Sequence, residues 1–342
     1  MPPDELILPS SAETGAIGIM HLKRYWAKAV AKRNGLLPMD ALQHEWETDN
    51  FLLNTLHLGL EQTLMKLFQD APGFDDLEQW IIRVNQGMID EERIQEFNAV
   101  LQSQGGFVPI AADEEKVLSA AEMEFWNDNG YVIVRNAISR EDCEETVAFM
   151  CEQLDIDLND PLSWYRPHVH REGIMVPLFQ HPLIERNRRS PRIRKAYEQL
   201  WNRRDIMVNT DKLGFNPPET TGWKFPASRL HWDVSLVQPI PFGTQGILYL
   251  TDTSASQGAF TVVPGFHHRI SDWLDALPAG NEPRKEDLYP LGAVPVAAAA
   301  GDLIIWHHAL PHAASANRAA MPRFVQYLNY APVFGGVQQE WK

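Results

Sequence analysis

The chain has 342 residues, of which 44% are hydrophobic and 22% are charged, values that are typical of a folded globular protein. This length exceeds what one hydrophobic core usually organises, so we expect about two structural units. The 45 acidic and 30 basic side chains give a formal net charge of -15. Nucleic acid is therefore disfavoured as a partner, because its phosphate backbone is also negative.

The cysteines and the hydropathy of the chain indicate the cellular compartment in which the protein is expected. Cys143 and Cys151 lie in a segment that reads as one helix, where side chains at this spacing point in different directions, so no disulfide framework is expected. The N-terminus lacks the basic and then apolar layout of a signal peptide, and no run approaches about 18 uninterrupted apolar residues. We expect a cytoplasmic protein that does not contact a membrane.

The first third of the chain has the spacing of amphipathic helices. Leucines recur on one helical face at positions 53, 56, 60, 64 and 67, with polar residues between them. Turn-forming residues at 34–35, 71–73 and 85–87 divide this region into about four helices, the second of which runs from 38 to 71.

A linker separates this region from the rest of the chain. Residues 102–106 are polar and rich in Gly, and Pro109 and an acidic patch at 113–115 follow them. We therefore expect a helical N-terminal domain at 1–112 and a second domain at 113–342. The helical domain can cover the mouth of an active site, shape a substrate pocket or make a dimer contact, and the sequence does not decide between these roles.

The second domain begins with helices and continues as strands. Capping residues at Ser119 and Ser139 predict two helices, with a strand at 131–134 between them. Further strands are predicted at 207–209, 246–250, 259–263, 293–297, 303–306 and 324–330. Their short connections leave no room for crossover helices, so we expect an antiparallel sandwich or barrel.

The strand-rich region contains a candidate metal site. In an extended segment, His231 and Asp233 point to the same face, because side chains two residues apart share a face. The candidates for a third ligand are His307, His308 and His312. Two histidines and one carboxylate form the facial triad of non-haem Fe(II) oxygenases.

A guanidinium near the last histidine suggests which candidate is the ligand. Arg323 begins the predicted strand after His312, so a metal ligand on one strand and an anion anchor on the next can face one cavity. Arg suits this role because its planar group donates two parallel hydrogen bonds to a carboxylate. This spacing favours His312 over His307 and His308.

Several blocks of the sequence resemble the phytanoyl-CoA dioxygenase family of Fe(II)- and 2-oxoglutarate-dependent oxygenases, through most of residues 116–335. These blocks are the opening at 118–137, the triplet at 231–233, the turn at 258–268, and the closing pattern Gly301-Asp302, His312, Asn317-Arg318 and Pro322-Arg323. The turn departs at Phe266, where the family usually has Ser.

The resemblance implies an α+β protein with a double-stranded β-helix core of the jelly-roll, cupin-like type. It implies that His231, Asp233 and His312 bind Fe(II) and that Arg323 binds the distal carboxylate of 2-oxoglutarate. Ser315 is a further candidate for that carboxylate, although many relatives place a Ser one residue earlier, where this chain has Ala314.

The reaction expected from the resemblance consumes O2, with ascorbate as the in vitro reductant. It hydroxylates an unactivated C–H bond of a small molecule, either a metabolite or a natural-product intermediate, and releases succinate and CO2. Asp233 argues against halogenation, because halogenases of this chemistry replace the carboxylate with a small residue to make room for halide.

Two other functions stay open at this point. One is a catalytically inactive, cupin-like metal-binding or regulatory protein, and the other is a zinc hydrolase with the same ligands, for which Arg323 has no use. A homodimer also stays open, and the substrate is not identified by the sequence.

Overall fold

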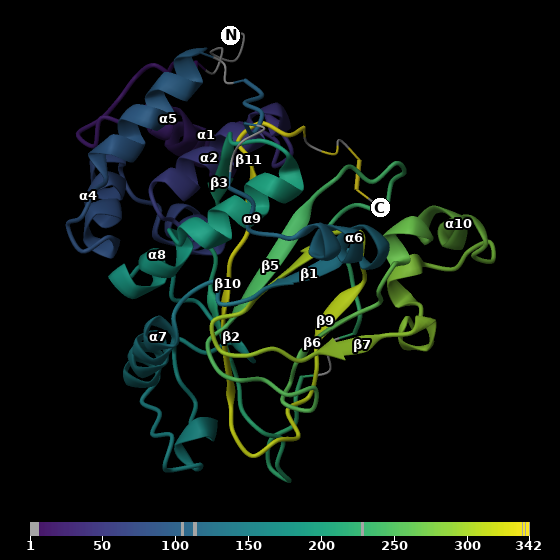
Figure 1. Cartoon of the computed structure of the whole chain (residues 1–342). Coiled ribbons are helices and arrows are strands. Elements are labelled where there is room, and N and C mark those ends of the chain that lie inside the picture. Colours follow the sequence, from purple (N-terminus) through teal and green to yellow (C-terminus); the bar gives the residue numbers. More distant parts are fainter. Residues whose placement is uncertain are drawn as a thin grey trace.

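The computed structural model describes residues 7–103, 106–111, 115–226, 229–336, 338 and 340–341. In Figure 1, the first helices gather at one side of a strand-rich body, and the later helices pack around that body. The domain boundary expected at 112–113 lies outside the described residues. In the described part of the chain, no helix combines the length and apolarity that crossing a membrane requires.

Helices fill residues 22–103 of the described chain. They are α1 (Leu22–Arg33), α2 (Trp46–Thr55), α3 (Leu60–Met65), α4 (Phe74–Val84) and α5 (Glu91–Ser103), with short 3₁₀ and π turns at Gln43–Glu45 and Lys66–Asp70. Their apolar faces form a hydrophobic core that includes Leu52, Ile81 and Phe97, each of which is fully buried. The helical character expected from the leucine spacing is thereby confirmed.

The single helix predicted from 38 to 71 is wrong, because the chain breaks between α2 and α3. His57 takes a left-handed conformation with φ of 53°, which ends α2. At Gly59 a Cβ atom would lie 2.5 Å from the ring of Phe179, so the chain passes too close to that ring for any larger residue. The break therefore depends on a contact with a distant part of the chain, which helical periodicity does not reveal.

Two of the later helices begin with the caps expected from the sequence. The later helices are α6 (Ala120–Asn129), α7 (Arg140–Gln153), α8 (Pro182–Arg188), α9 (Pro191–Trp201) and α10 (Ile270–Asp275). Ser119 and Ser139 each accept a hydrogen bond from the backbone three residues later, where an acidic side chain bonds back to the cap. Both predicted helix starts are confirmed.

The strands form antiparallel sheets. They are β1 (Tyr131–Val134), β2 (Met175–Val176), β3 (Ile206–Val208), β4 (Leu213–Asn216), β5 (Thr244–Tyr249), β6 (Phe260–Val262), β7 (Val294–Val296), β8 (Leu303–His307), β9 (His312–Ala314), β10 (Arg323–Tyr327) and β11 (Tyr330–Pro332). One sheet has the order β1-β8-β5-β10-β4-β2, a second has the order β7-β6-β9, and β11 pairs with β3.

The six-stranded and three-stranded sheets enclose one core, as in a jelly roll. Ile247, Ile304 and Val325 of the larger sheet belong to the same buried cluster as Phe260 and Ala313 of the smaller sheet. The opposite face of the larger sheet packs in a second cluster with residues of α7, α8 and α9. This arrangement confirms the expected α+β fold with a double-stranded β-helix core.

Two predictions about the strands need correction. The strand predicted at 324–330 is two strands, because β10 pairs with β4 and β5 whereas β11 pairs with β3 in a separate sheet. The strand β4 was not predicted, since its Leu-Gly-Phe-Asn sequence is neither alternating nor rich in β-branched residues.

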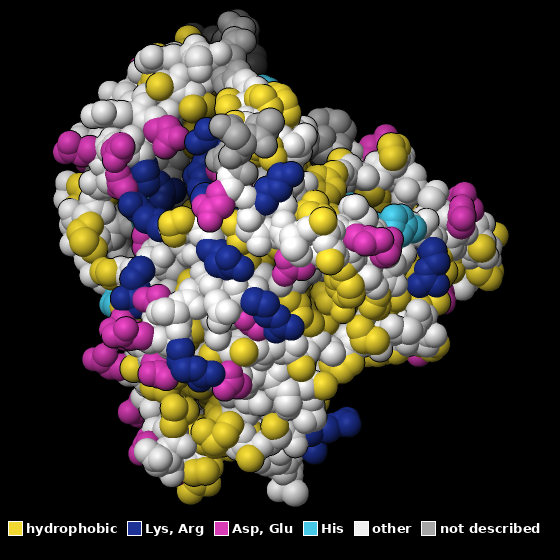
Figure 2. All heavy atoms as spheres, in the orientation of Figure 1, with side chains coloured by type: hydrophobic (Ala, Val, Ile, Leu, Met, Phe, Trp, Pro, Cys, Tyr) yellow, Lys and Arg dark blue, Asp and Glu magenta, His cyan; other side chains and the backbone are white. Residues whose placement is uncertain are grey.

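Basic residues of α8 and α9 pair with acidic neighbours. Arg186 of α8 lies 2.6 Å from Glu145, and Arg194 of α9 lies 2.7 Å from Glu198. Figure 2 shows the same mixture on this face of the molecule, where Lys and Arg side chains lie beside Asp and Glu. This face therefore offers no extended positive surface to an anionic partner.

A buried ion cluster links α1 to α2 and the turn before it. The Nζ atom of Lys28 lies 2.6 Å from Oδ2 of Asp49 and 3.1 Å from Oε2 of Glu45, and Lys28 is only 4% exposed. His21, Glu45 and Asp49 have the composition of a metal site. However, the Lys28 ammonium already binds both carboxylates, so we interpret the cluster as structural.

We expect Lys28→Ala to lower the free energy of unfolding by about 3–5 kcal/mol, because it leaves two carboxylates without their buried cation. Chemical denaturation monitored by circular dichroism measures this change. Lys23→Ala on the same helix is the matched control, since Lys23 pairs with Glu13 at the surface and is expected to contribute far less. Equal effects of the two substitutions would contradict a structural role for the cluster.

Candidate metal centre and co-substrate cavity

A backbone bridge brings the first and last candidate ligands together. The N–H of His231 donates to the carbonyl of His312, and the N–H of His312 donates to the carbonyl of His231, both at 3.0 Å. His312 is the first residue of β9, so the bridge adds the segment around His231 to the edge of the smaller sheet. The two imidazole rings end with their centroids 4.8 Å apart.

Asp233 completes a cluster of three potential ligands. Its Oδ2 lies 3.2 Å from Nε2 of His312, and its Oδ1 lies 3.6 Å from Nε2 of His231. One donor atom from each of the three side chains lies within 4.8 Å of the other two. The structure thus brings together the three residues that the sequence marked as candidate ligands.

Backbone carbonyls orient both imidazole rings. Nδ1 of His231 lies 2.8 Å from the carbonyl oxygen of Arg229, and Nδ1 of His312 lies 3.2 Å from that of Leu310. When Nδ1 carries the ring proton and donates it to these carbonyls, Nε2 keeps a lone pair directed at the cluster. This is the usual arrangement of histidines that bind metals.

Gln245 holds the carboxylate of Asp233. Its Nε2 donates to Oδ2 of Asp233 at 2.7 Å, while its Oε1 accepts a hydrogen bond from Nε1 of Trp306 at 3.1 Å. Burial alone would raise the pKa of Asp233, but the adjacent His312, the hydrogen bond from Gln245 and the nearby His231 lower it below its usual value. The carboxylate is therefore in its ionised, metal-binding form at neutral pH.

The middle residue of the triplet points away from the cluster. Trp232 is 2% exposed, packs near Phe266 and Trp273, and donates from Nε1 to the carbonyl of Ala309 at 2.9 Å. Because Trp232 is held in the hydrophobic core, its neighbours His231 and Asp233 face the opposite side of the segment, where they line the cavity.

The cluster opens into a cavity of about 480 Å³ that also contains Arg323. Arg323 is fully buried at the start of β10, and its Nη1 donates to the carbonyl of Gly258. In the described part of the chain, its Nε and Nη2 atoms have no hydrogen-bond partner. The hydroxyl of Tyr327 lies on the same strand face, and the Arg323 charge opposes the rise in pKa that burial causes there. A buried guanidinium with two unused donors is suited to binding a carboxylate.

Ser315 is not placed in this cavity. Its Oγ donates to the carbonyl of Ala259 at 2.9 Å, and the cavity is lined instead by Ala313 and Ala314 of β9. His307 and His308 are also outside it, with His307 accepting from the N–H of Ala309 and His308 contacting the carbonyl of Pro241.

Sequence reasoning missed Gln245 and Tyr327. The predicted strand at 246–250 began one residue too late to include Gln245, although β5 starts at Thr244. Tyr327 is four residues after Arg323 on one strand, so alternation alone places the two on one face. A search for polar side chains on the same strand faces as the candidate ligands would have found both.

The residues present fit a divalent metal ion. Two imidazole nitrogens and one ionised carboxylate converge on one point beside a cavity, which is the donor set of the facial triad with open coordination positions. The unpartnered N–H groups of Arg323 face the same cavity and match an anionic co-substrate next to that ion.

We expect Gln245→Ala to weaken metal binding by about 10- to 100-fold, because it releases the carboxylate of Asp233 from its orienting donor. Titration of the purified protein with Co(II), followed by absorbance, measures this affinity without requiring turnover. Gln79→Ala, at an exposed position on α4, serves as the matched control. An unchanged affinity in Gln245→Ala would contradict the orienting role.

Comparison with known proteins places this geometry in a family. The model of the phytanoyl-CoA dioxygenase (PhyH) family matches residues 126–325, a span that includes all three residues of the cluster and Arg323. A Dictyostelium discoideum homologue, whose name assigns it to the phytanoyl-CoA dioxygenases, is 22% identical over 261 residues, covering 61% of this chain and 74% of that protein.

Solved structures show weaker similarity. EctD from S. alaskensis, in its apo form, has 15% identity and a TM-score of 0.47, covering 68% of this chain and 86% of that chain. SnoK, described as a non-heme alpha ketoglutarate dependent carbocyclase from nogalamycin biosynthesis, has 21% identity and a TM-score of 0.43, covering 66% and 87% of the two chains. The family assignment rests on the sequence match, which spans more than half of the chain: this protein belongs to the phytanoyl-CoA dioxygenase family.

Proposed function

We propose that this protein is a non-haem Fe(II)- and 2-oxoglutarate-dependent dioxygenase that hydroxylates an unactivated C–H bond of a small molecule. In the balanced reaction, 2-oxoglutarate, O2 and the substrate R–H give succinate, CO2 and R–OH. The observation that carries the proposal is a single cavity with a two-histidine, one-carboxylate cluster and a buried guanidinium that has two unused donors. A metabolite or a natural-product intermediate would fill the rest of the cavity.

Each residue has a role that follows from its place in the cavity. His231, Asp233 and His312 would hold Fe(II), which, when bound, supplies the activation of O2 and the oxidation of the substrate C–H bond. Nε and Nη2 of Arg323 would donate to the distal carboxylate of 2-oxoglutarate and so fix the end of the co-substrate that does not react.

The apolar lining would keep bulk water from the reacting groups. Ile247, Phe260 and Trp306 line the cavity and are all at most 3% exposed. Exclusion of water strengthens the interaction of Arg323 with an anion, because charges attract more strongly in a medium of low dielectric constant. The protein's contribution is thus binding, orientation and protection of the reacting groups.

Substitution of the ligands tests the proposal directly. We expect His231→Ala, Asp233→Ala and His312→Ala each to abolish succinate formation in an aerobic assay with Fe(II), ascorbate and 2-oxoglutarate, because a site with two ligands no longer holds the metal in place. Chromatography of the organic acids measures succinate, which oxygenases of this type release slowly even without their substrate.

His268→Ala is the matched histidine control, since His268 is exposed, lies outside the cavity and contacts the carbonyl of Asn127. The proposal fails if the wild type takes up iron but forms no succinate, or if the three ligand variants keep the wild-type rate. A zinc-dependent hydrolase would likewise show no oxygen-dependent consumption of 2-oxoglutarate.

A second prediction concerns Arg323. A hydrogen bond to a charged group contributes about 1.5–3 kcal/mol, so we expect Arg323→Ala to raise the Kd for 2-oxoglutarate by roughly 10- to 100-fold. Calorimetric titration of the metal-loaded protein under anaerobic conditions measures this constant separately from turnover.

Two further variants make this test decisive. Arg323→Lys fills the buried position and keeps the charge but loses the planar pair of donors, so its Kd should lie between those of the wild type and Arg323→Ala. Arg318→Ala removes an exposed guanidinium nearby and should leave the Kd unchanged. If both Arg323 variants fold, by circular dichroism, and bind 2-oxoglutarate as the wild type does, Arg323 is not the anchor.

A further inference from the structure

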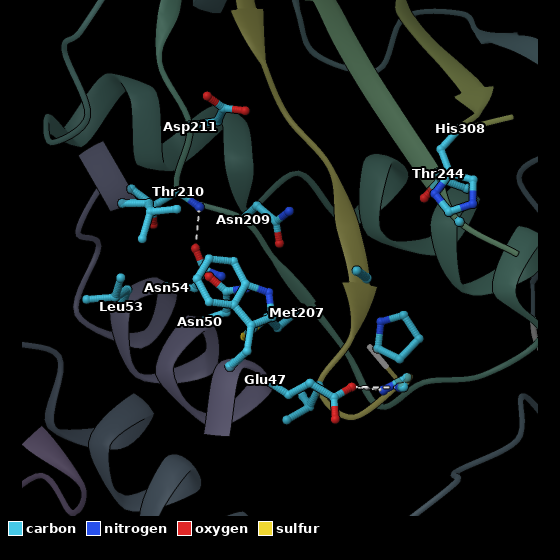
Figure 3. A pocket seen from close by; sticks show the side chains of 18 of the residues that line it. Glu47, Asn50, Leu53, Asn54, Met207, Asn209, Thr210, Asp211, Thr244 and His308 are labelled. Carbon is cyan, nitrogen blue, oxygen red and sulfur yellow. Dashed lines mark hydrogen bonds between the residues drawn. The ribbon is translucent and has the colours of Figure 1, made fainter. Parts of the chain in front are cut away.

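A second cavity, of about 560 Å³, lies between α2 and the strand-rich body. Figure 3 shows Glu47, Asn50 and Leu53 of α2 on one side of it, and Met207, Thr210 and Thr244 on the other. Asn54 holds the two sides together, because its Oδ1 accepts a hydrogen bond from the N–H of Thr210 at 2.6 Å. The helical N-terminal region therefore forms part of the cavity wall.

This second cavity adjoins the one that contains the candidate metal centre. Asn209, Asp211 and Lys212 line both cavities. They belong to the segment between β3 and β4. The two cavities therefore lie on either side of the same short segment of chain.

Asp211 lies where the two cavities adjoin, and its carboxylate is paired with no cation among the described residues. Its Oδ1 accepts the N–H of Lys212 at 2.7 Å, and within the described residues its carboxylate makes no ion pair. The ammonium of Lys212 bonds to Glu61 instead, at 2.7 Å. Arg188 is close, but its Nη2 donates to the main-chain oxygen of Asp211, at 2.7 Å.

The surroundings of Asp211 favour a ligand that carries a positive charge. Burial raises its pKa, although Lys212, Arg188 and the backbone N–H of Lys212 act in the opposite direction. A carboxylate in this condition gains most from a ligand that brings a positive charge, because the ligand replaces the lost interaction with water.

The rest of the second cavity is also suited to a cation. Of the described residues that line it, Lys212 is the only Lys or Arg, whereas Glu47, Glu61 and Asp211 are acidic. The amides of Asn50 and Asn209 make no side-chain hydrogen bond that the structure records within its described part, so they can bind polar groups of a ligand. Trp46 and Phe242, each 41% exposed, add aromatic surface that attracts cations.

We propose that the substrate is an elongated molecule bearing an amine, whose ammonium group binds Asp211 while its far end occupies the second cavity against α2. The carbon to be oxidised would lie in the first cavity, beside His231, Asp233 and His312. This inference rests on the proposed oxygenase function and specifies the substrate class of the same site.

Paired probes test the inference without knowledge of the natural substrate. The probes are three amines with their neutral acetylated forms: glucosamine and N-acetylglucosamine, tyramine and N-acetyltyramine, and spermidine and N1,N4,N8-triacetylspermidine. Binding is measured by calorimetry on the full-length protein loaded with Co(II) and 2-oxoglutarate. We expect at least one amine to bind about tenfold or more tightly than its acetylated form, because its bond to Asp211 is charge-assisted.

The variants separate Asp211 from a general effect of negative charge. Asp211→Asn should bring the two members of a discriminated pair to within about twofold of each other, since it removes the charge but preserves the shape. Glu47→Gln should weaken the binding of spermidine, the longest probe, by a smaller factor than Asp211→Asn does. Asp75→Asn, an exposed position on α4, should preserve the full discrimination.

The possible outcomes are distinct for the two proposals. Equal binding of every amine and its acetylated form, no binding of any probe, or discrimination that survives in Asp211→Asn would each overturn the assignment of Asp211. Failure of the wild type to form succinate from 2-oxoglutarate, measured in parallel, would instead overturn the oxygenase function.

Discussion

The site depends on the pair of reciprocal backbone hydrogen bonds between His231 and His312. Side chains alternate along extended chain, so a slip of one residue at this bridge would turn either imidazole away from the cavity. The buried Trp232 and the pairing of β9 with β6 oppose such a slip from both sides. The convergence of the three candidate ligands is therefore a property of strand register, and the larger sheet contributes the second half of the site through Gln245 and Arg323.

Arg323 shows why a stable fold can contain an energetically unfavourable residue. A fully buried guanidinium whose Nε and Nη2 have no hydrogen-bond partner among the described residues costs free energy, because their N–H groups have lost their hydration. An anionic ligand would remove the cost, and the same imbalance that weakens the empty protein would strengthen its binding of a carboxylate.

Local patterns predicted most of the fold, and contacts between distant residues account for what they missed. Capping at Ser119 and Ser139 and the apolar run of β8 are signals contained within a few residues, and these elements formed as expected. The break at Gly59 depends on Phe179, and the division between β10 and β11 depends on their pairing with strands of different sheets. The spacing between His312 and Arg323 predicted one shared cavity, and both residues line it. The hydrogen bond from Ser315 to the carbonyl of Ala259 depends on how the chain folds around Ser315, which the sequence pattern does not reveal.

Under the proposed function, the first cavity would hold the reacting groups and the second cavity would recognise the rest of the substrate. The cluster of His231, Asp233 and His312 depends on the sheets alone, so it can be kept while the rest of the site changes. Recognition of a long ligand, in contrast, would depend on Asp211 and on α2, which is held against the sheet body by the bond from Thr210 to Asn54. Because α2 packs in the core formed by the first five helices, the position of that wall is set by a part of the chain that lies outside the family match at 126–325. A helical segment added beside a set of ligands can in this way change which substrate is bound while the ligands stay the same.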